Sequence, residues 1–338
     1  MKMDRRNSWV RVIACFMVVL LHVSSQNFSS FGDKWWAANF FDSFSRACVP
    51  LFLMISGEAL LKKDEALSVF FKKRCVRILP PLIFWSCFYL AWLAYNGVDV
   101  GNWIIKIAQG PVMYHLWYFY VLIGLYATVP VLRKFFLNST KSEQVAILAI
   151  WVLVASIYPQ FAEVYNSIFG GGEILSDKLN STYSLVYFSG YIGYFLLGAY
   201  VGNSEKNNFK VGFLIFFISS FLTMCFTYVM SIKIGKPTEL FFGYLSPFVL
   251  AAAYGLFSML MALKKEAPSK ILSAISDCSL GIYCLHVLMI DRFSAALGIS
   301  VKFGNPWIAP LVVSGLVFIA SLAIIFVCRK VKFCRYVM

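Results

Sequence analysis

The chain alternates long apolar runs with short polar segments over its whole length. Ten runs have about 17 to 25 mainly apolar residues, the length that an α-helix needs to cross a bilayer. Short segments rich in Lys, Asn, Gly and Pro separate them. This pattern predicts an all-α, polytopic integral membrane protein in which residues 1–338 form a single transmembrane domain. The predicted spans are 8–26, 43–61, 78–96, 115–133, 143–162, 185–203, 209–230, 239–263, 277–296 and 307–328.

Composition and charge agree with this class and orient the chain. Hydrophobic residues make up 60% of the sequence and charged residues 14%, far from the balance of a soluble protein. The net charge of +14 does not indicate nucleic-acid binding, because the basic residues lie in short clusters beside apolar runs. If the N-terminus is cytoplasmic, 22 of the 30 Lys and Arg residues fall on the cytoplasmic side, which predicts that both termini lie there. Nine scattered cysteines form no CxxC pair, so neither a metal site nor a disulfide framework is expected.

Two ionisable residues, Arg11 and His22, lie in the first predicted span. An Arg, Lys or Asp within a span costs about 2.5–3.5 kcal/mol on insertion scales, so such residues usually face a cavity or serve a function. Eleven helical steps separate the two, about 16 Å and three turns, which places both on one helix face. Taken alone, Arg11 is explained as an anchor at the cytoplasmic surface, and His22 as a residue hydrogen-bonded between helices. Because both lie on one helix face, a single groove that contacts both residues is favoured.

The second predicted span, SFSRACVPLFLMISGEALL, carries Arg46 near its outer end and Glu58 near its inner end. They are about 18 Å apart, so Arg46 lies at the depth of the first-span histidine and Glu58 closer to that of Arg11. A Glu58–Arg11 pair that neutralises two costly groups is the simplest interpretation of the carboxylate. Ser56 and Gly57 allow another helix to approach closely.

A basic cluster, FFKKRCVRILPP, precedes the third predicted span, and Pro80 and Pro81 are expected to open that helix. The cluster includes Lys73, Arg74 and Arg77. Basic residues beside a span ordinarily anchor it to anionic lipid, at about 1 kcal/mol each. The alternative is a cytoplasmic phosphate site, because guanidinium groups pair with phosphate oxygens through two hydrogen bonds.

The other two histidines also lie in or beside predicted spans. His115, in YHLWYFY, opens the fourth span, where Tyr114, Trp117 and Tyr118 fit an interfacial aromatic belt. His286, in SLGIYCLH, lies within the ninth span, three residues after Tyr283. The candidate site residues among these are His115, Trp117, Tyr283 and His286.

Taken together, these motifs resemble the acyltransferase-3 family of bacterial membrane acyltransferases. The resemblance rests on Arg11 and His22 with ten residues between them, on RACVPLFLMISG, and on the RxxR motif at Arg74 and Arg77. YHLWYFY and SLGIYCLH complete it, in the family's order on ten spans. Within the family, the chain is most similar to the branch that O-acetylates enterobacterial common antigen.

The resemblance implies an O-acetyltransferase of the bacterial inner membrane. Such enzymes move an acyl group from cytoplasmic acetyl-CoA to a sugar hydroxyl of a surface or lipid-linked polysaccharide at the outer face. It implies that His22 is the catalytic centre and that Arg11, Arg74 and Arg77 hold the donor, with Lys73 beside them. Arg46, His115 and His286 match recurrent positions of the family.

The residues fit this chemistry in more than one way. A histidine can act as general base on an acceptor hydroxyl, or accept the acyl group itself before passing it on. Arg46 or His115 is placed to stabilise the developing oxyanion. Two other functions remain open: a transporter or flippase of lipid-linked glycans, and a sensory module with vestigial catalytic residues. The acceptor sugar and the oligomeric state are not determined by the sequence.

Overall fold

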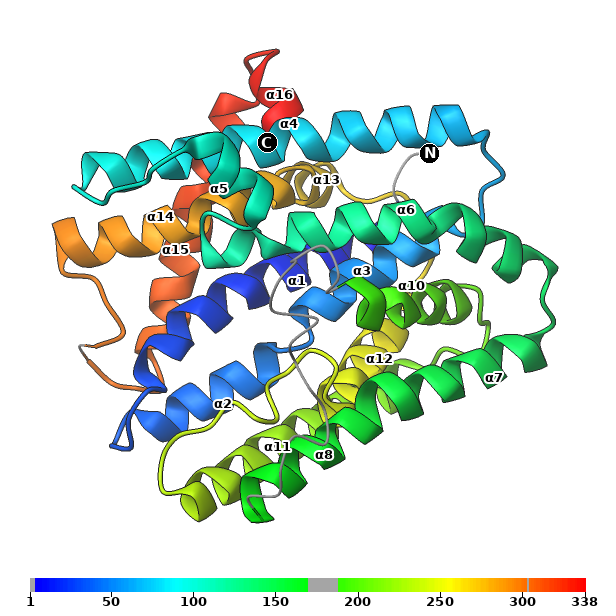
Figure 1. Cartoon of the computed structure of the whole chain (residues 1–338), viewed down its shortest axis with the longest axis horizontal. Coiled ribbons are helices and arrows are strands. Elements are labelled where there is room, and N and C mark those ends of the chain that lie inside the picture. The colour runs from blue at the N-terminus through cyan, green and yellow to red at the C-terminus, as the bar shows by residue number, and fades with distance from the viewer. Residues whose placement is uncertain (1–3, 170–187, 303) are drawn as a thin grey trace.

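The computed structural model describes residues 4–169, 188–302 and 304–338, which form helices joined by short loops (Figure 1). The predicted all-α, polytopic membrane fold is confirmed. Within these residues, seven helical segments are long and apolar enough to cross a membrane, and each overlaps a predicted span. They are Arg5–Asn27, Leu67–Tyr95, Tyr114–Asn138, Lys141–Phe169, Phe209–Ile234, Ser279–Leu297 and Ala309–Cys328.

These segments comprise most of the labelled helices. The first is α1 (Arg5–Ser24) followed by η1 (Ser25–Asn27), and the third is η2 (Tyr114–Leu116) followed by α6 (Trp117–Asn138). The fourth is a continuous rod of α7 (Lys141–Val152), the π-turn η3 (Leu153–Ile157) and α8 (Tyr158–Phe169). The single helices are α4 (Leu67–Tyr95), α11 (Phe209–Ile234), α14 (Ser279–Leu297) and α15 (Ala309–Cys328).

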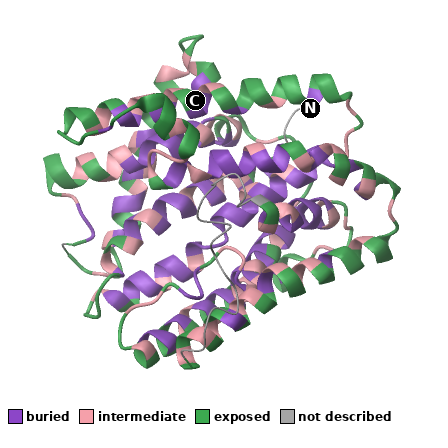
Figure 2. Ribbon diagram, in the orientation of Figure 1, coloured by how far each residue is buried: buried purple, intermediate pink, exposed green. Residues whose placement is uncertain are grey.

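The remaining three predicted spans correspond to shorter apolar helices. These are α3 (Cys48–Leu60), α10 (Phe188–Gly202) and α12 (Pro247–Met261). Figure 2 shows buried residues concentrated on α1, α3, α10 and α12, while α4, α7 and α11 carry many exposed residues. The short helices therefore form the interior of the bundle. Residues 185–187 of the sixth predicted span, and Lys178 in the charge count, lie outside the described residues.

The structure corrects the predicted start of the third span. Helix α4 begins at Leu67, so the basic cluster is helical and Pro80 and Pro81 lie inside the helix. Proline tends to open a helix because it lacks the N–H that a helix interior requires. Helix α4 continues through both prolines without those two hydrogen bonds, so the basic cluster extends the span as part of one continuous helix.

The second predicted span is broken. A helix that the sequence did not predict, α2 (Trp35–Ser45), precedes α3, and the break falls at Arg46 and Ala47. Pro50 explains its position, because a proline ring clashes with the carbonyl four residues earlier, which belongs to Arg46. Three further short helices were not predicted: α5 (Trp103–Gln109), α13 (Lys270–Asp277) and α16 (Cys334–Val337).

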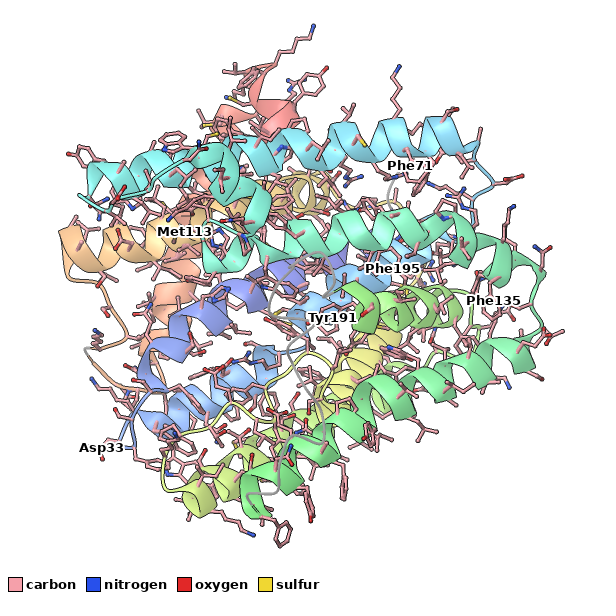
Figure 3. The ribbon with its side chains drawn as sticks, viewed as in Figure 1. Asp33, Phe71, Met113, Phe135, Tyr191 and Phe195 are labelled. Atoms are coloured by element: carbon pink, nitrogen blue, oxygen red, sulfur yellow. The ribbon has the colours of Figure 1, made fainter. Side chains whose placement is uncertain are left out.

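Helices α3 and α10 pack backbone to backbone. A Cβ atom on Gly57 would overlap the main chain of Phe195, and one on Gly198 would overlap the main chain of Met54. Phe195 lies in the middle of the bundle, whereas Phe71 lies on the outer helix α4 (Figure 3). The close approach expected at Gly57 is therefore present, and small residues are what permit it.

This contact gives a stability prediction. Gly198→Val should destabilise the fold by about 3 kcal/mol, because the clash is with backbone and no side chain can rotate away. The matched control is Gly315→Val on α15, where an added Cβ meets nothing within 4 Å. Thermal unfolding in detergent, read by size-exclusion chromatography, should separate the two. Equal melting temperatures for both variants would contradict the backbone contact.

Candidate functional site

The three histidines of the chain lie together. They come from α1, η2 and α14, at positions 22, 115 and 286 of the sequence. The ring centroids of His22 and His286 are 5.2 Å apart at an interplanar angle of 24°, and those of His115 and His286 are 5.3 Å apart at 76°. Tertiary packing thus joins three residues that the sequence presented separately.

Two of these imidazoles are each held in one tautomer by a main-chain carbonyl. Nδ1 of His286 lies 2.6 Å from the carbonyl oxygen of Tyr283, and Nε2 of His115 lies 3.3 Å from that of Cys284. A carbonyl only accepts hydrogen bonds, so these nitrogens carry the protons in the neutral rings. The opposite nitrogens, Nε2 of His286 and Nδ1 of His115, are buried and have no hydrogen-bond partner in the described part of the chain. Each therefore presents a lone pair.

His22 differs from both. Its ring makes no hydrogen bond to any residue that the structure describes, and its side chain is only partly buried. It lines a small cavity of about 10 Å³ together with His115, Trp117 and Tyr118. The ring of Tyr114 packs edge-on at a centroid distance of 5.0 Å. His22 is thus the imidazole most free to exchange a proton or to react.

Tyrosine hydroxyls fix the frame around the histidines. The Tyr283 hydroxyl donates to the main-chain carbonyl of His115, and the Tyr89 hydroxyl donates to that of Cys284 at 2.7 Å. These bonds tie α14 to η2 and to α4, so the positions of both tautomer-locked histidines depend on them. Tyr283 thus helps to hold His115 in position, although it is not one of the three histidines.

A second cavity, of about 110 Å³, adjoins the small one and follows α1 toward Arg11. The two cavities share Val18, Val49, Tyr118 and Tyr283 in their walls. Most of the remaining lining is apolar or aromatic. A narrow, largely apolar passage thus runs along the helix face that the sequence predicted for Arg11 and the first-span histidine.

A third cavity, of about 330 Å³, adjoins the other end of the passage and is strongly basic. Arg11 and Arg77 line both the passage and this cavity. Neither guanidinium has a hydrogen bond or ion pair with any described residue. Asp277 is the one acidic side chain in the described lining, against five basic ones. Cations without protein partners around an open cavity favour an anionic ligand. The basic lining residues are Arg11, Lys73, Arg77, Arg329 and Arg335.

Lys73 and Arg74 of the basic cluster interact with a glutamate. Glu65 accepts a hydrogen bond from Lys73 and lies 3.9 Å from the guanidinium of Arg74. This hydrogen bond is the main reason that the pKa of Glu65 lies below its usual value. Arg74 also packs over the ring of Phe70, with its guanidinium carbon 5.3 Å from the ring centroid, and it lines neither the passage nor the basic cavity. Lys73 lines the basic cavity despite its ion pair.

Arg46 lies at the break between α2 and α3 and is paired. Its guanidinium donates to Asp42 at 2.9 Å, and Glu239 lies 4.0 Å away. The ring of Phe242 packs against it at 4.4 Å. Asp42 is fully buried, so the pair is shielded from solvent on that side. Arg46 does not line the three adjoining cavities.

The structure corrects the expected partner of Glu58. The carboxylate accepts hydrogen bonds from Lys62 at 3.0 Å and from Asn7 at 3.3 Å, and it does not pair with Arg11. It also packs against Gly202 of α10. Lys62 lies one helical turn along the chain from Glu58 and pairs with it locally, which leaves Arg11 without an ion-pair partner among the described residues.

Trp117 faces the small cavity and stacks on Tyr244 at a centroid distance of 5.7 Å. Several residues that line the cavities had no site role assigned from the sequence. Arg329 and Arg335 counted only as orienting charges, and Tyr118 as part of an aromatic belt. Only the folded chain shows which basic and aromatic side chains face inward.

Metal ligation has no support in the described ranges, where no group of three or more His, Cys, Asp or Glu side chains is arranged to hold an ion. The nine cysteines are all unpaired.

The fold and site define a polytopic helical membrane protein with a histidine cluster reached along α1 from a basic cavity. Residues 8–330 match the family model described as "Acyltransferase domain", and the chain belongs to the acyltransferase-3 family. No curated protein and no solved structure matches the chain. The protein is therefore a membrane acyltransferase.

Proposed function

We propose that the protein is an O-acyltransferase, most simply an O-acetyltransferase, that uses acyl-CoA as donor. It would act in the bacterial inner membrane, with the acceptor a sugar hydroxyl of a surface or lipid-linked polysaccharide at the outer face. One observation carries the proposal: adjoining cavities lead along α1 from unpaired arginines to His22.

The basic cavity supports the choice of donor. Acyl-CoA has phosphate groups at one end and a thioester at the end of a slender pantetheine arm. Arg11 and Arg77 stand where the basic cavity meets the narrow passage, so they would bind phosphates while the arm enters the passage. The passage spans about 16 Å between the levels of Arg11 and His22, in the direction that the arm would extend.

At His22, two routes are consistent with the geometry. In direct transfer, the acceptor oxygen attacks the thioester carbonyl as its proton passes to the imidazole, the C–S bond breaks, and the proton goes to the leaving thiolate. In two-step transfer, an imidazole nitrogen attacks the carbonyl, the C–S bond breaks and coenzyme A leaves as its thiolate. The acceptor oxygen then attacks the acyl carbon as the N–acyl bond breaks. In that second step, the lone pair on His115 would accept the proton of the acceptor hydroxyl, which then passes to the thiolate.

The competing function is a transporter or flippase of lipid-linked glycans. That function would leave the unpaired arginines at the basic cavity without a ligand, which is why we favour acyl transfer. The predicted orientation, with both termini in the cytoplasm, would put the basic cavity on the side that contains acyl-CoA. We also propose that the chain is close to the branch that modifies enterobacterial common antigen.

The test supplies labelled acetyl-CoA to the cytoplasmic face of inverted membrane vesicles and follows label into glycan. Arg11→Ala should raise the KM for acetyl-CoA by about tenfold or more, because a charge-assisted contact to phosphate is lost. The matched control is Arg5→Ala, which removes an exposed charge of the same helix that pairs with Glu266 at 3.3 Å.

Transfer of label by the wild type, with a higher KM in Arg11→Ala than in Arg5→Ala, would support the proposal. Glycan that crosses the membrane without gaining label in any strain would favour the transporter instead. An unchanged KM in Arg11→Ala would reject the assigned donor path.

A further inference from the structure

The C-terminal segment folds back over the basic cavity. The indole nitrogen of Trp85 on α4 donates to the carbonyl of Val337 at 2.8 Å, and Arg329 donates to that of Met338 at 2.7 Å. Arg335 donates through Nε to the carbonyl of Arg329, also at 2.7 Å. Figure 1 shows α16 lying against α4. Residues 331–338 lie beyond the family match, which ends at residue 330.

The cations of the basic cavity fall into two groups by position. Arg11 and Arg77 line both this cavity and the passage, so they stand at the junction. Lys73, Arg329 and Arg335 line the basic cavity but not the passage. The cavity therefore has cations beyond the two that stand at the junction.

Within the second group, Arg335 is the arginine with both terminal guanidinium nitrogens free for a ligand. Only its Nε is engaged, so its terminal guanidinium nitrogens are free, and the side chain is exposed. Arg329 gives one terminal nitrogen to Met338, and Lys73 is paired with Glu65. A planar guanidinium with two free nitrogens matches the oxygens of a phosphate monoester.

Coenzyme A carries phosphate in two places: a diphosphate next to the pantetheine arm, and a 3′-phosphate on the ribose farther from the thioester. The arm must enter the passage, so the diphosphate belongs at the junction arginines. We propose that Arg335, carried by the C-terminal segment, binds the 3′-phosphate of the donor. This inference rests on the proposed function, because it takes acyl-CoA as the donor.

The test measures equilibrium binding of CoA and of dephospho-CoA, which lacks only the 3′-phosphate, to the purified full-length protein in nanodiscs. Wild type should bind CoA about tenfold or more tightly than dephospho-CoA, because a monoester near −2 charge is lost. Arg335→Ala should reduce this preference to near one by weakening CoA binding alone. Arg77→Ala should weaken both ligands to a similar degree.

Lys332→Ala is the matched control, since it removes a charge from the same segment without lining the cavity, and it should keep the wild-type preference. Arg335→Lys retains a charge and should keep part of the preference, which separates ligand contact from misfolding. An undiminished preference in Arg335→Ala, or an equal loss for both ligands, would overturn the inference. Failure of the wild type to bind either ligand would instead reject acyl-CoA as donor.

Discussion

His22→Ala is expected to lower acyl transfer by about 10²- to 10⁴-fold, the usual contribution of a positioned acid–base group. The expectation rests on the one imidazole of the cluster whose ring has no hydrogen bond within the described residues and which borders a cavity. The KM for the proposed acyl-CoA donor should change little, because its phosphates would bind at the other end of the passage. Steady-state transfer from labelled acetyl-CoA to the purified acceptor glycan gives both parameters.

His22→Asn keeps a polar side chain in the same place and controls for loss of packing, so it should be nearly as inactive as the alanine variant. Rapid quenching without acceptor then separates the two routes. Acyl label on the wild-type protein, absent from His22→Asn, would indicate two-step transfer, and its absence from both would indicate direct transfer. Transfer within threefold of wild type in His22→Ala would reject His22 as the catalytic centre.

The second large effect is expected at Asp42. Asp42→Ala should destabilise the fold by about 3 kcal/mol, because it leaves the buried guanidinium of Arg46 without its closest counter-ion. Removal of both partners in Asp42→Ala/Arg46→Met should recover much of this loss, since an apolar pair of similar volume avoids the unpaired charge. Thermal unfolding of the single and double variants gives the coupling free energy.

Asp291→Ala is the matched control, because it breaks an exposed pair with Arg292 and should cost less than about 1 kcal/mol. The double variant also tests the proposed chemistry of Arg46. If Arg46 stabilises the oxyanion, the double variant should fold and remain inactive. A folded and fully active double variant would assign the pair to structure alone.

The histidine cluster could be predicted from the sequence only in part. Helical periodicity placed Arg11 and His22 on one face, and the adjoining cavities follow that face. Periodicity relates residues within one helix, so it did not bring His115 and His286 to His22 or fix their tautomers. The carbonyl of Tyr283 that holds His286 is local to α14, whereas the carbonyl of Cys284 reaches His115 only through helix packing.

The roles of the basic cluster could also be predicted from the sequence only in part. The sequence marked Arg74 and Arg77 alike, yet Arg77 borders the cavities while Arg74 turns to Glu65. Charge placement oriented the chain but assigned no ligand to Arg335, because a basic residue after the last span has the same pattern whether it faces lipid or a cavity.

The sequence by itself determined the membrane class, the order of the spans and the family motifs, because apolar length and residue spacing are local properties that burial in lipid enforces. The tertiary structure decided which helices are interior and which charges remain unpaired. Those outcomes depend on contacts between residues far apart in the chain, such as Gly198 with Met54 and Trp85 with Val337. Packing of whole helices sets such contacts, and no local pattern specifies them.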